Sequence, residues 1–289
     1  MKFYGTSAAQ GTPSPFCRCE GCENARKTGG KEIRRRSMFR LSEHISLDLG
    51  ADASQLAIEF GDFYALQHVL VTHTHEDHLA HMMMNIRNMS TVITPEPLNF
   101  YFTDKAYDIV DFYRNSAPII KGRTAELEER GIVAFHRLEF GQSYKIDDIT
   151  VKPFKGNHKG NMKENCANYL IDLPCGKRLF YGLDTGWYLD ETFAALENAQ
   201  IDIFIGECTF GLKADRERHP DNHMDAASDM LLFDELIARR AVTPQTKVYL
   251  THINHFSSHA DLEAFFAVAK TPFDSPVTIA YDGMELDVR

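Results

Sequence analysis

Apolar runs bounded by polar or glycine residues mark the strands expected in this chain. Residues 45–50 alternate apolar and polar side chains, which is typical of a strand with one buried face, and residues 69–71 form a short apolar run. Five further segments of this kind are expected to be strands: residues 2–6, 151–154, 178–183, 201–205 and 247–251.

Segments with apolar residues at helical spacing lie between these runs. Residues 79–88, 190–199 and 225–240 are expected to be helices, and the methionines of the first are interpreted as packing residues. Residues 99–131 are polar with recurrent aromatic residues, which predicts one or two amphipathic helices outside the central sheets. The same aromatic residues are also compatible with the mouth of a pocket. Residues 1–289 contain no repeat or low-complexity linker, so one α/β domain with two sheets inside and helices outside is expected.

Length and charge narrow the class of protein further. A chain of 289 residues that is 44% hydrophobic can bury a large core. No apolar run approaches the roughly 20 residues of a membrane span and the amino terminus has no signal-peptide core, so a cytoplasmic protein without a membrane partner is expected. The net charge of −10 disfavours a nucleic-acid partner but allows a small anionic substrate, because bound divalent ions reverse the potential locally. A homodimer is compatible with this composition.

The histidine-rich motif HTHEDH at residues 73–78 carries the strongest chemical signal. It directly follows an apolar run, so its side chains leave the end of an expected strand on a turn. Three imidazoles and a carboxylate so close together cannot all face one ion. His73 and His75 can bind one metal, while Asp77 and His78 can reach a second a few Å away. A polar turn that is rich in histidine by chance is the alternative interpretation.

Three later strand ends also carry a residue type that binds metals. His158, Asp184 and His252 follow the expected strands at residues 151–154, 178–183 and 247–251. Strand ends that gather along one edge of a sheet converge on a common cleft, so these side chains are expected to meet. Each one alone is equally compatible with a polar strand terminus. Asp48, at the end of another strand, is expected either to brace the ligand loop or to form a plain turn.

Cysteine usage points to a second kind of metal site. Cys17, Cys19 and Cys22 lie at spacings of two and three, which suits a tetrahedral ion but leaves one position open. The fourth ligand must come from elsewhere in the chain. Reduced surface or core thiols are the alternative, because six cysteines in a chain of this size do not suggest a disulfide framework.

The run Arg34-Arg35-Arg36 is the only dense basic segment. Such a run is compatible with a solvated face. It is equally compatible with a phosphate-binding edge, since guanidinium groups match phosphate oxygens.

The order of the candidate ligands resembles the metallo-β-lactamase superfamily over nearly the whole chain. The residues that carry this resemblance are His73, His75, Asp77, His78, His158, Asp184 and His252. Gly5-Thr6, the cysteine trio, Asn222-His223 and the segments 251–255 and 281–285 resemble one branch more closely. This branch is the PhnP-like phosphodiesterases, whose namesake opens phosphoribosyl 1,2-cyclic phosphate. The resemblance implies an αββα sandwich of two mixed β-sheets flanked by helices.

The resemblance also implies the distribution of ligands over the metal ions. One catalytic ion would be bound by His73, His75 and His158, and the other by Asp77, His78 and His252, with Asp184 between them. The cysteine trio, in a loop of about residues 12–30, would bind a structural zinc with His255 as the fourth ligand. The catalytic ions would be manganese or zinc, or else iron, because nitrogen and oxygen ligands accept all three.

His223 matches a histidine of the family that is a candidate general acid, a role for which imidazole is well suited. A helix cap or surface residue is the alternative. Together with the ligands Asp77 and Asp184, His223 completes the expected catalytic residues. The other histidines are interpreted as structural or surface residues: His44, His68, His81, His136, His219 and His259.

The resulting hypothesis is a metal-dependent phosphoric diester hydrolase, in which a hydroxide activated by two metals attacks a small or cyclic phosphodiester. Phosphoribosyl 1,2-cyclic phosphate is one candidate substrate. Expected insertions before the histidine motif, at residues 99–131 and at residues 159–165 leave the substrate open. The alternatives are another hydrolase of the same fold, such as a tRNA 3′-processing-type nuclease or a lactonase, and a PqqB-like binding protein.

Overall fold

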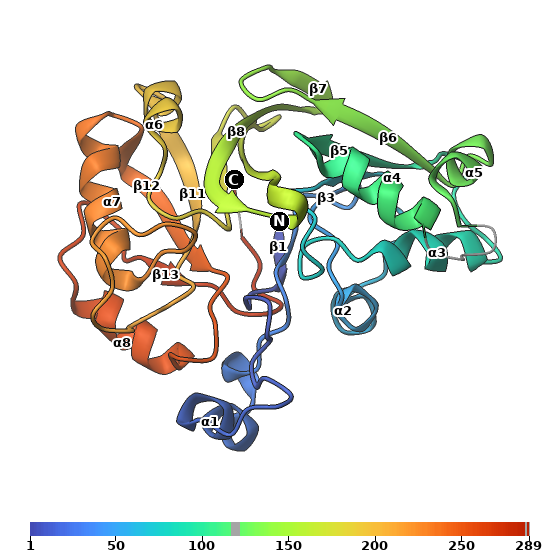
Figure 1. The fold of residues 1–289 in the computed structure, drawn as a ribbon. Helices are drawn as coiled ribbons and strands as arrows, with labels where there is room; N and C mark the ends of the chain where they lie inside the picture. The colour runs from blue at the N-terminus through green and yellow to red at the C-terminus, as the bar shows by residue number, and fades with distance from the viewer. Residues whose placement is uncertain (117–121, 287, 289) are drawn as a thin grey trace.

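Two mixed β-sheets form the centre of the computed structural model, which describes residues 1–116, 122–286 and 288 (Figure 1). The first sheet contains, in spatial order, β1 (Lys2–Gly5), β2 (Met38–Arg40), β3 (Ile45–Leu47), β4 (His68–Leu70), β5 (Leu98–Thr103) and β6 (Val133–Leu138). The second contains β13 (Thr278–Ile279), β12 (Val242–Thr251), β11 (Ile201–Glu207), β10 (Arg178–Gly182), β9 (Asn165–Asp172), β8 (Ile149–Lys159) and β7 (Tyr144–Ile146). Strands β3 to β6 and β10 to β13 are parallel, whereas the remaining pairs are antiparallel.

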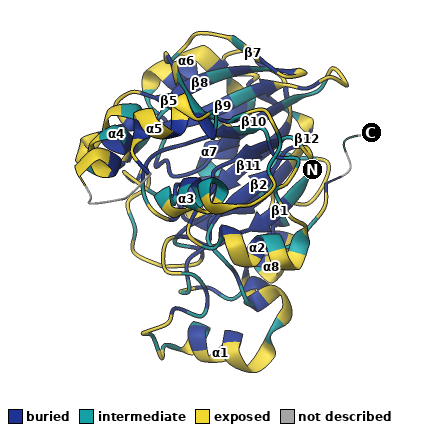
Figure 2. Cartoon of the chain, turned by 90° about the vertical axis from the view of Figure 1, so that its right-hand side faces the viewer, coloured by how far each residue is buried: buried dark blue, intermediate teal, exposed yellow. Residues whose placement is uncertain are grey.

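Helices cover the outer face of each sheet (Figure 1). The first sheet is covered by α2 (Ala53–Phe60), α3 (His81–Met89), α4 (Ala106–Ser116) and α5 (Thr124–Glu129). The second is covered by α6 (Asp190–Leu196), α7 (Ala226–Ala238) and α8 (His259–Val268). Helix α1 (Glu20–Thr28) lies apart from both sheets in Figures 1 and 2. Two short 3₁₀ turns, η1 (Gly30–Glu32) and η2 (Asn161–Lys163), complete the elements. None of the described helices has the length and apolar character needed to cross a membrane.

The alternation of side chains along the strands creates three apolar layers. Ile203 and Ile205 of β11 face the first sheet, whereas Phe204 between them packs among the helices on the other side. Each such buried side chain stabilises the fold by about 1.5–3 kcal/mol. Figure 2 shows the buried strands inside and exposed residues on the outer helix faces. The expected αββα sandwich is therefore confirmed.

The prediction that the segment beginning at residue 99 is helical is wrong for its first residues. Residues 99–103 belong to β5, which pairs in parallel with β4 and β6. Phe100 and Phe102 pack against the outer helices, while Tyr101 joins the core between the sheets. Aromatic residues favour strands, and a strand that is apolar on both faces lacks the alternation that identifies strands in sequence. The helices of this segment are α4 and α5, and its residues 117–121 lie outside the described residues.

The arginine run forms neither a solvated face nor a phosphate-binding edge. Arg34 is buried and donates hydrogen bonds to the carbonyl oxygens of Asn254 and Ser257, at 3.3 and 3.2 Å. The other two guanidinium groups form ion pairs with carboxylates of the protein. These pairs are Arg35 with Asp282 and Glu59, and Arg36 with Asp52. The run therefore joins the amino-terminal segment to the carboxyl-terminal half of the chain.

Candidate metal centres

The candidate ligands meet where strands of the two sheets end. Asp48 directly follows β3, and His252 directly follows β12, while Asp184 comes two residues after β10. All three have positive φ angles, of 62°, 55° and 47°. This region of backbone space is sparsely populated by residues other than glycine, and each case costs about 1–3 kcal/mol. Such strain is typical of functional sites. Here the kinks turn Asp184 and His252 toward the other candidate ligands and Asp48 toward the rear of His78.

The first candidate group contains His73, His75, His158 and Asp184, whose ligand atoms lie within 4.8 Å of one another. His73 Nε2 is 2.8 Å from His75 Nδ1, and His158 Nε2 is 3.4 Å from the same atom. Asp184 Oδ2 is 3.5 Å from His73 Nε2. His158 lies within β8 rather than after it, because this strand continues to Lys159.

The second candidate group contains Asp77, His78, His252 and again Asp184, with the same mutual limit of 4.8 Å. The Nε2 atoms of His78 and His252 are 3.2 Å apart. Asp184 Oδ1 is 2.7 Å from His252 Nε2 and 3.4 Å from His78 Nε2. One carboxylate oxygen of Asp184 thus faces each group, which is the arrangement of a carboxylate between two ions.

Hydrogen bonds behind the imidazoles determine which nitrogen faces the cleft. His78 Nδ1 is 2.7 Å from Asp48 Oδ2, and His252 Nδ1 is 2.8 Å from Thr209 Oγ1. With these Nδ1 protons directed outward, the Nε2 lone pairs of the neutral rings point at each other, and either a proton or a metal ion between them removes the conflict. The contact between His252 Nε2 and Asp184 Oδ1 also lacks hydrogen-bond geometry. The donor set therefore fits divalent metal ions, and Asp48 has the bracing position that was one of its two expected roles.

Burial and charge act in opposite directions on these imidazoles. Burial lowers the pKa of His158 to about 4, so this ring is neutral at neutral pH. Burial also opposes protonation of His252, but the carboxylates of Asp184 and Asp77 raise its pKa to about 10. A metal ion must therefore displace a proton from this part of the cluster, and its affinity is expected to fall as the pH falls.

His223 lies beside both ligand groups and is paired with a carboxylate. Its ring centroid is 4.8 Å from that of His158 and 5.7 Å from that of His252. Its Nδ1 is 3.1 and 3.2 Å from the two carboxylate oxygens of Glu207. Burial opposes protonation of His223, but Glu207 raises its pKa above the usual value. Because Nδ1 faces Glu207, Nε2 is the atom left to face a substrate.

Glu207 is a candidate functional residue that the sequence patterns did not single out. It is 2% exposed, and it accepts hydrogen bonds from the backbone N–H groups of Thr185 at 2.6 Å and Met224 at 3.3 Å. The expected strand ended at residue 205, whereas β11 continues to Glu207. A carboxylate that closely follows an apolar run was the available signal, as it was for Asp184 two residues after β10. Glu207, His223 and His252 also form a third close group, but we interpret it as an ion pair beside the metal ligands.

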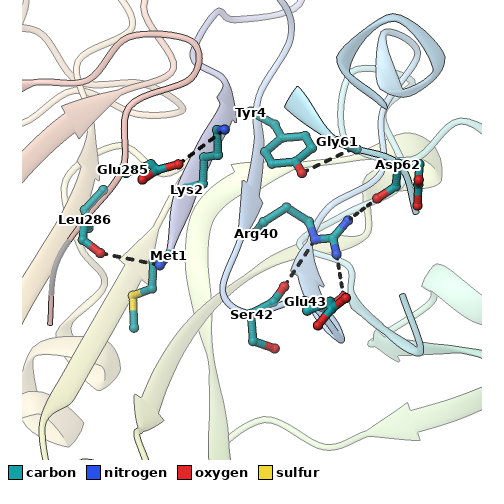
Figure 3. A pocket seen from close by; sticks show the side chains of 10 residues that line it. All are labelled: Met1, Lys2, Tyr4, Arg40, Ser42, Glu43, Gly61, Asp62, Glu285 and Leu286. Carbon is teal, nitrogen blue, oxygen red and sulfur yellow. Dashed lines mark hydrogen bonds and ion pairs between the residues drawn. The ribbon is translucent and has the colours of Figure 1, made fainter. Parts of the chain in front are cut away.

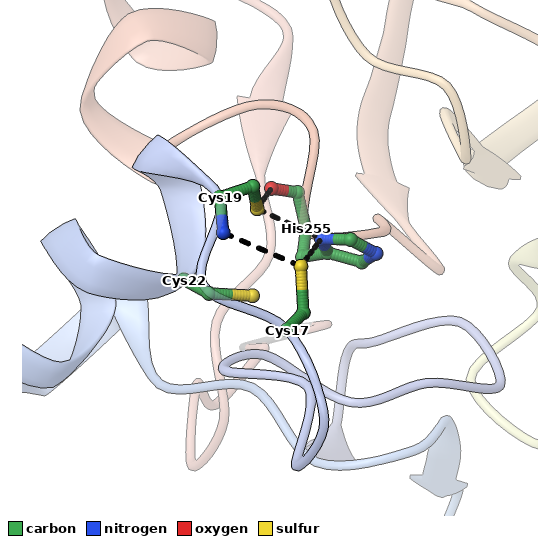
Figure 4. Close-up of side chains that lie close together, drawn as sticks. All are labelled: Cys17, Cys19, Cys22 and His255. Carbon is green, nitrogen blue, oxygen red and sulfur yellow. Dashed lines mark hydrogen bonds between the residues drawn. The ribbon is translucent and has the colours of Figure 1, made fainter.

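The cysteine trio forms a separate group with His255 (Figure 4). Cys19 Sγ and Cys17 Sγ are 3.2 and 3.7 Å from His255 Nδ1, and all four ligand atoms lie within 4.8 Å of one another. A tetrahedral zinc with Zn–S bonds of about 2.3 Å places its ligand atoms roughly 3.8 Å apart. Figure 4 shows the three sulfur atoms and the imidazole pointing toward one another, so the group fits one closed zinc site.

Gly21 explains how this loop approaches His255 so closely. A Cβ atom at Gly21 would lie 2.2 Å from the carbonyl oxygen of His255, which is far inside van der Waals contact. Burial lowers the pKa of His255, which favours the neutral ring that a metal ligand needs. Local sequence therefore brings three sulfurs together, and a glycine lets the fourth ligand reach them.

The remaining histidines belong to none of the close ligand groups among the described residues. His219 stacks on Trp187 with ring centroids 3.9 Å apart, and His259 Nε2 is 3.0 Å from Glu263 Oε1. His68 and His136 both contact Tyr101. These contacts agree with structural or surface roles.

Two hollows differ in their relation to the ligands. A cavity of about 480 Å³ is lined in part by His75 and Asp77 and therefore adjoins the cleft. A hollow of about 700 Å³ is lined by the amino terminus, Arg40 and Glu285, and by none of the candidate ligands (Figure 3). In Figure 3 the Arg40 guanidinium lies against the carbonyl oxygen of Ser42, 3.3 Å from its Nε. Only the smaller cavity is placed to receive a substrate of the metal centres.

Comparisons with known proteins agree with the arrangement of the two sheets. The sequence model of the beta-lactamase superfamily domain matches residues 50–253. No curated protein matches the sequence. The chain is similar to a diphosphatase from the PhnP family, with 16% identity, a TM-score of 0.70, and coverage of 99% of this chain and 96% of the other.

Two further solved structures share the fold over the whole chain. Zinc-bound PqqB from Methylobacterium extorquens has 16% identity and a TM-score of 0.70, with 99% of each chain covered. The short form of human tRNase Z has 15% identity and a TM-score of 0.61, with 100% of each chain covered. At these identities the similarity establishes the fold, and activity has to be inferred from the site.

Proposed function

This chain belongs to the beta-lactamase superfamily, and from that premise we propose that it is a metal-dependent phosphodiesterase acting on a small or cyclic phosphodiester. The observation that carries this proposal is the position of His223. It is paired with Glu207 and lies beside two ligand groups that share Asp184. Two adjacent cations and a separate proton donor are the components needed to displace an alkoxide from phosphorus.

Each component has a distinct task in this reaction. When bound, two divalent ions lower the pKa of a coordinated water and offset the charge that develops on the phosphate oxygens. Asp184 holds the two ligand groups in register, and Asp48 and Thr209 orient the imidazoles of His78 and His252. His223 donates a proton from Nε2 to the departing oxygen while Glu207 stabilises the imidazolium at Nδ1.

The chemistry of the donor atoms limits the metals. Both catalytic groups combine imidazole nitrogens with carboxylate oxygens, which accept manganese, zinc or iron. The group of Cys17, Cys19, Cys22 and His255 is sulfur-rich and closed, so we assign it a structural zinc. The expected content is therefore two catalytic ions and one structural ion per chain.

Other activities of this fold are less well supported. The net charge of −10 disfavours a tRNA 3′-processing nuclease, because RNA binding needs many contacts from Lys and Arg to phosphate. A binding protein without catalysis would not need the pair of His223 and Glu207. The proposed substrate is accordingly a small anionic phosphodiester.

Metal content and a substrate screen test this proposal together. We expect three metal ions per chain by elemental analysis, and hydrolysis of bis(p-nitrophenyl) phosphate and cyclic phosphodiesters in preference to lactones. Asp184→Asn should abolish most of this activity because it weakens both ligand groups at once. The matched control is Asp234→Asn, which changes an exposed carboxylate on α7. Fully active Asp184→Asn, or activity in protein stripped of its metals, would refute the mechanism.

A further inference from the structure

The cavity of about 480 Å³ beside His75 and Asp77 has walls from three separate elements. Tyr113 of α4 and His81 at the start of α3 form one side, and Asn161 of η2 forms another. Pockets for small ligands commonly measure about 300–1,000 Å³, so the volume suits one sugar ring with an attached base. The cavity therefore extends the cleft toward a part of the substrate that lies beyond the reacting phosphorus.

Two side chains offer hydrogen-bond acceptors to this cavity. Asn161 Nδ2 donates to the carbonyl oxygen of Thr74 at 2.7 Å, which leaves Asn161 Oδ1 free of any partner among the described residues. The carboxylate of Glu76 is exposed, and it forms no ion pair or hydrogen bond with the residues that the structure describes. Both groups suit the hydroxyl groups of a sugar, and the negative charge of Glu76 opposes an anion.

The loop that carries Asn161 is held in place by a buried carboxylate. The backbone N–H of Thr74 donates to Glu164 Oε1 at 2.5 Å, and the hydroxyl of Thr74 donates to the same atom. The backbone N–H of Glu164 in turn donates to the carbonyl oxygen of Asn161 at 3.0 Å. This wall of the cavity is thus fixed before a ligand enters.

Aromatic rings form the other wall. Tyr113 is 44% exposed although it packs against His81, with ring centroids 5.7 Å apart. Burial together with the neighbouring Arg114 lowers the pKa of His81 to about 4, so the imidazole is neutral at neutral pH. The Arg114 guanidinium is itself directed at the carbonyl oxygen of His81 and at Asn85 Oδ1, at 3.0 and 2.7 Å. Lysine and arginine are absent from the described residues that line the cavity.

Building on the proposed function, we infer that this cavity binds an uncharged, hydroxyl-bearing ring of the substrate, such as a nucleoside, and discriminates against a second phosphate. Tyr113 supplies the face on which the ring packs, and Glu76 and Asn161 accept hydrogen bonds from its hydroxyl groups. A substrate with a further phosphate at this end would meet the Glu76 carboxylate, and the described lining residues offer no lysine or arginine to offset that charge. Phosphoribosyl 1,2-cyclic phosphate, which carries such a phosphate, is therefore a poorer fit than a nucleoside cyclic phosphate.

Two substrates that differ by one phosphate test this inference. We would compare kcat/KM for adenosine 2′,3′-cyclic phosphate and for the same compound phosphorylated at the 5′ position. Bis(p-nitrophenyl) phosphate serves as the reference substrate, because the ratio of activities cancels any change in metal occupancy. The parent protein should prefer the unphosphorylated nucleoside on the order of tenfold or more, and Glu76→Lys should reverse this preference.

Matched variants separate the local effect from a global one. Glu96→Lys makes the same charge change at another exposed carboxylate and should leave the preference unchanged. Tyr113→Ala should raise KM for the nucleoside substrate on the order of tenfold, the usual size of the loss when a stacking ring is removed. Tyr64→Ala removes another exposed tyrosine ring, which does not line the cavity, and should have no such effect.

The outcomes distinguish this inference from the function on which it rests. If the reference diester is hydrolysed but Glu76→Lys and Tyr113→Ala leave the substrate ratios unchanged, the assignment of this cavity is wrong. A parent preference for the 5′-phosphorylated compound overturns it as well. If the metal-loaded protein hydrolyses no phosphodiester, the proposed function itself has failed.

Discussion

From the pairing of Glu207 with His223 we predict that the loss of activity in variants of this pair depends on the leaving group of the substrate. Replacing Glu207 by glutamine keeps the shape of the side chain but removes its charge. The glutamine oxygen can still accept the hydrogen bond from Thr185 N at the position of Oε1. The amide nitrogen then takes the position of Oε2, 3.1 Å from His223 Nδ1, where it can no longer accept the hydrogen bond from Met224 N. A donor in that position favours the neutral imidazole, which is a far weaker acid than the imidazolium.

The size of the effect follows from the geometry. Two unit charges 3.1 Å apart interact by about 5 kcal/mol at an effective dielectric constant of about 20. A positioned general acid contributes about 10²–10⁴-fold to rate, or roughly 3–5 kcal/mol. The interaction energy lost with the Glu207 charge is thus as large as the whole contribution of the general acid His223 to lowering the activation barrier. We expect Glu207→Gln to lower kcat at least about tenfold for an alkoxide leaving group, and His223→Ala to lower it about 10²-fold or more.

The assay compares two leaving groups at the same metal occupancy. A sugar or alkyl alkoxide needs a proton as it departs, whereas p-nitrophenolate does not. Both variants should therefore lose far more activity toward a cyclic nucleoside phosphate than toward bis(p-nitrophenyl) phosphate. Glu217→Gln, which alters an exposed carboxylate in the neighbouring loop, is the control. Equal losses on both substrates would make His223 a binding or structural residue and would refute its assignment as the acid.

Three further predictions concern the metals and stability. Cys19→Ser should release one zinc and lower the melting temperature, because a closed metal site contributes directly to folding. Cys175→Ser replaces an exposed thiol and should change neither the zinc content nor the melting temperature. Equal zinc content in the two variants would contradict this site. Asp48→Asn should weaken binding of the catalytic ions about 10- to 100-fold in a chelator competition, since it braces His78; unchanged affinity would contradict that role. Burial raises the pKa of Asp282 to about 6. Between about pH 4 and pH 6 the folded protein therefore keeps a proton that the unfolded chain releases. The free energy of unfolding should fall by about 2–3 kcal/mol as the pH rises through this range. Asp282→Asn should remove that loss in urea unfolding measured at both pH values, and an identical pH trend in the two proteins would show that Asp282 is not responsible.

The candidate metal ligands could be predicted from the spacing of residues that are close together in the sequence. The motif at residues 73–78 places four candidate metal ligands on one turn, and Asp184 and His252 each end an apolar run. The spacing within the motif and the end of an apolar run both depend only on residues that are neighbours in the chain. Both can therefore be recognised without a structure. The partner of the cysteine trio was reached through the resemblance, because His255 lies more than 230 residues away and no local pattern connects the two.

Other features depend on long-range packing that sequence patterns do not encode. Arg34 is buried because carbonyl oxygens of Asn254 and Ser257 accept its hydrogen bonds across the whole chain. Residues 99–103 form a strand because β4 and β6 pair with both edges, although their aromatic residues face both sides. Glu207 gains its proposed role only through its ion pair with His223, which comes from the loop before α7. In each case the deciding partner is distant in sequence, so periodicity alone cannot predict the role.

The cysteine group and the catalytic groups share one short segment of backbone. His252 and His255 are three residues apart, and Ile253 between them exchanges backbone hydrogen bonds with the amino-terminal segment at Thr6 and Ala8, at 2.9 and 3.3 Å. The positive φ of His252 is a strained conformation that surrounding contacts must maintain. The strand bridge at Ile253 restricts the backbone from which the His252 imidazole projects. The proposed zinc would restrict it further by anchoring His255 on the other side. The loop of helix α1 belongs to neither of the two proposed catalytic groups, yet through such a zinc it would stabilise the position of His252.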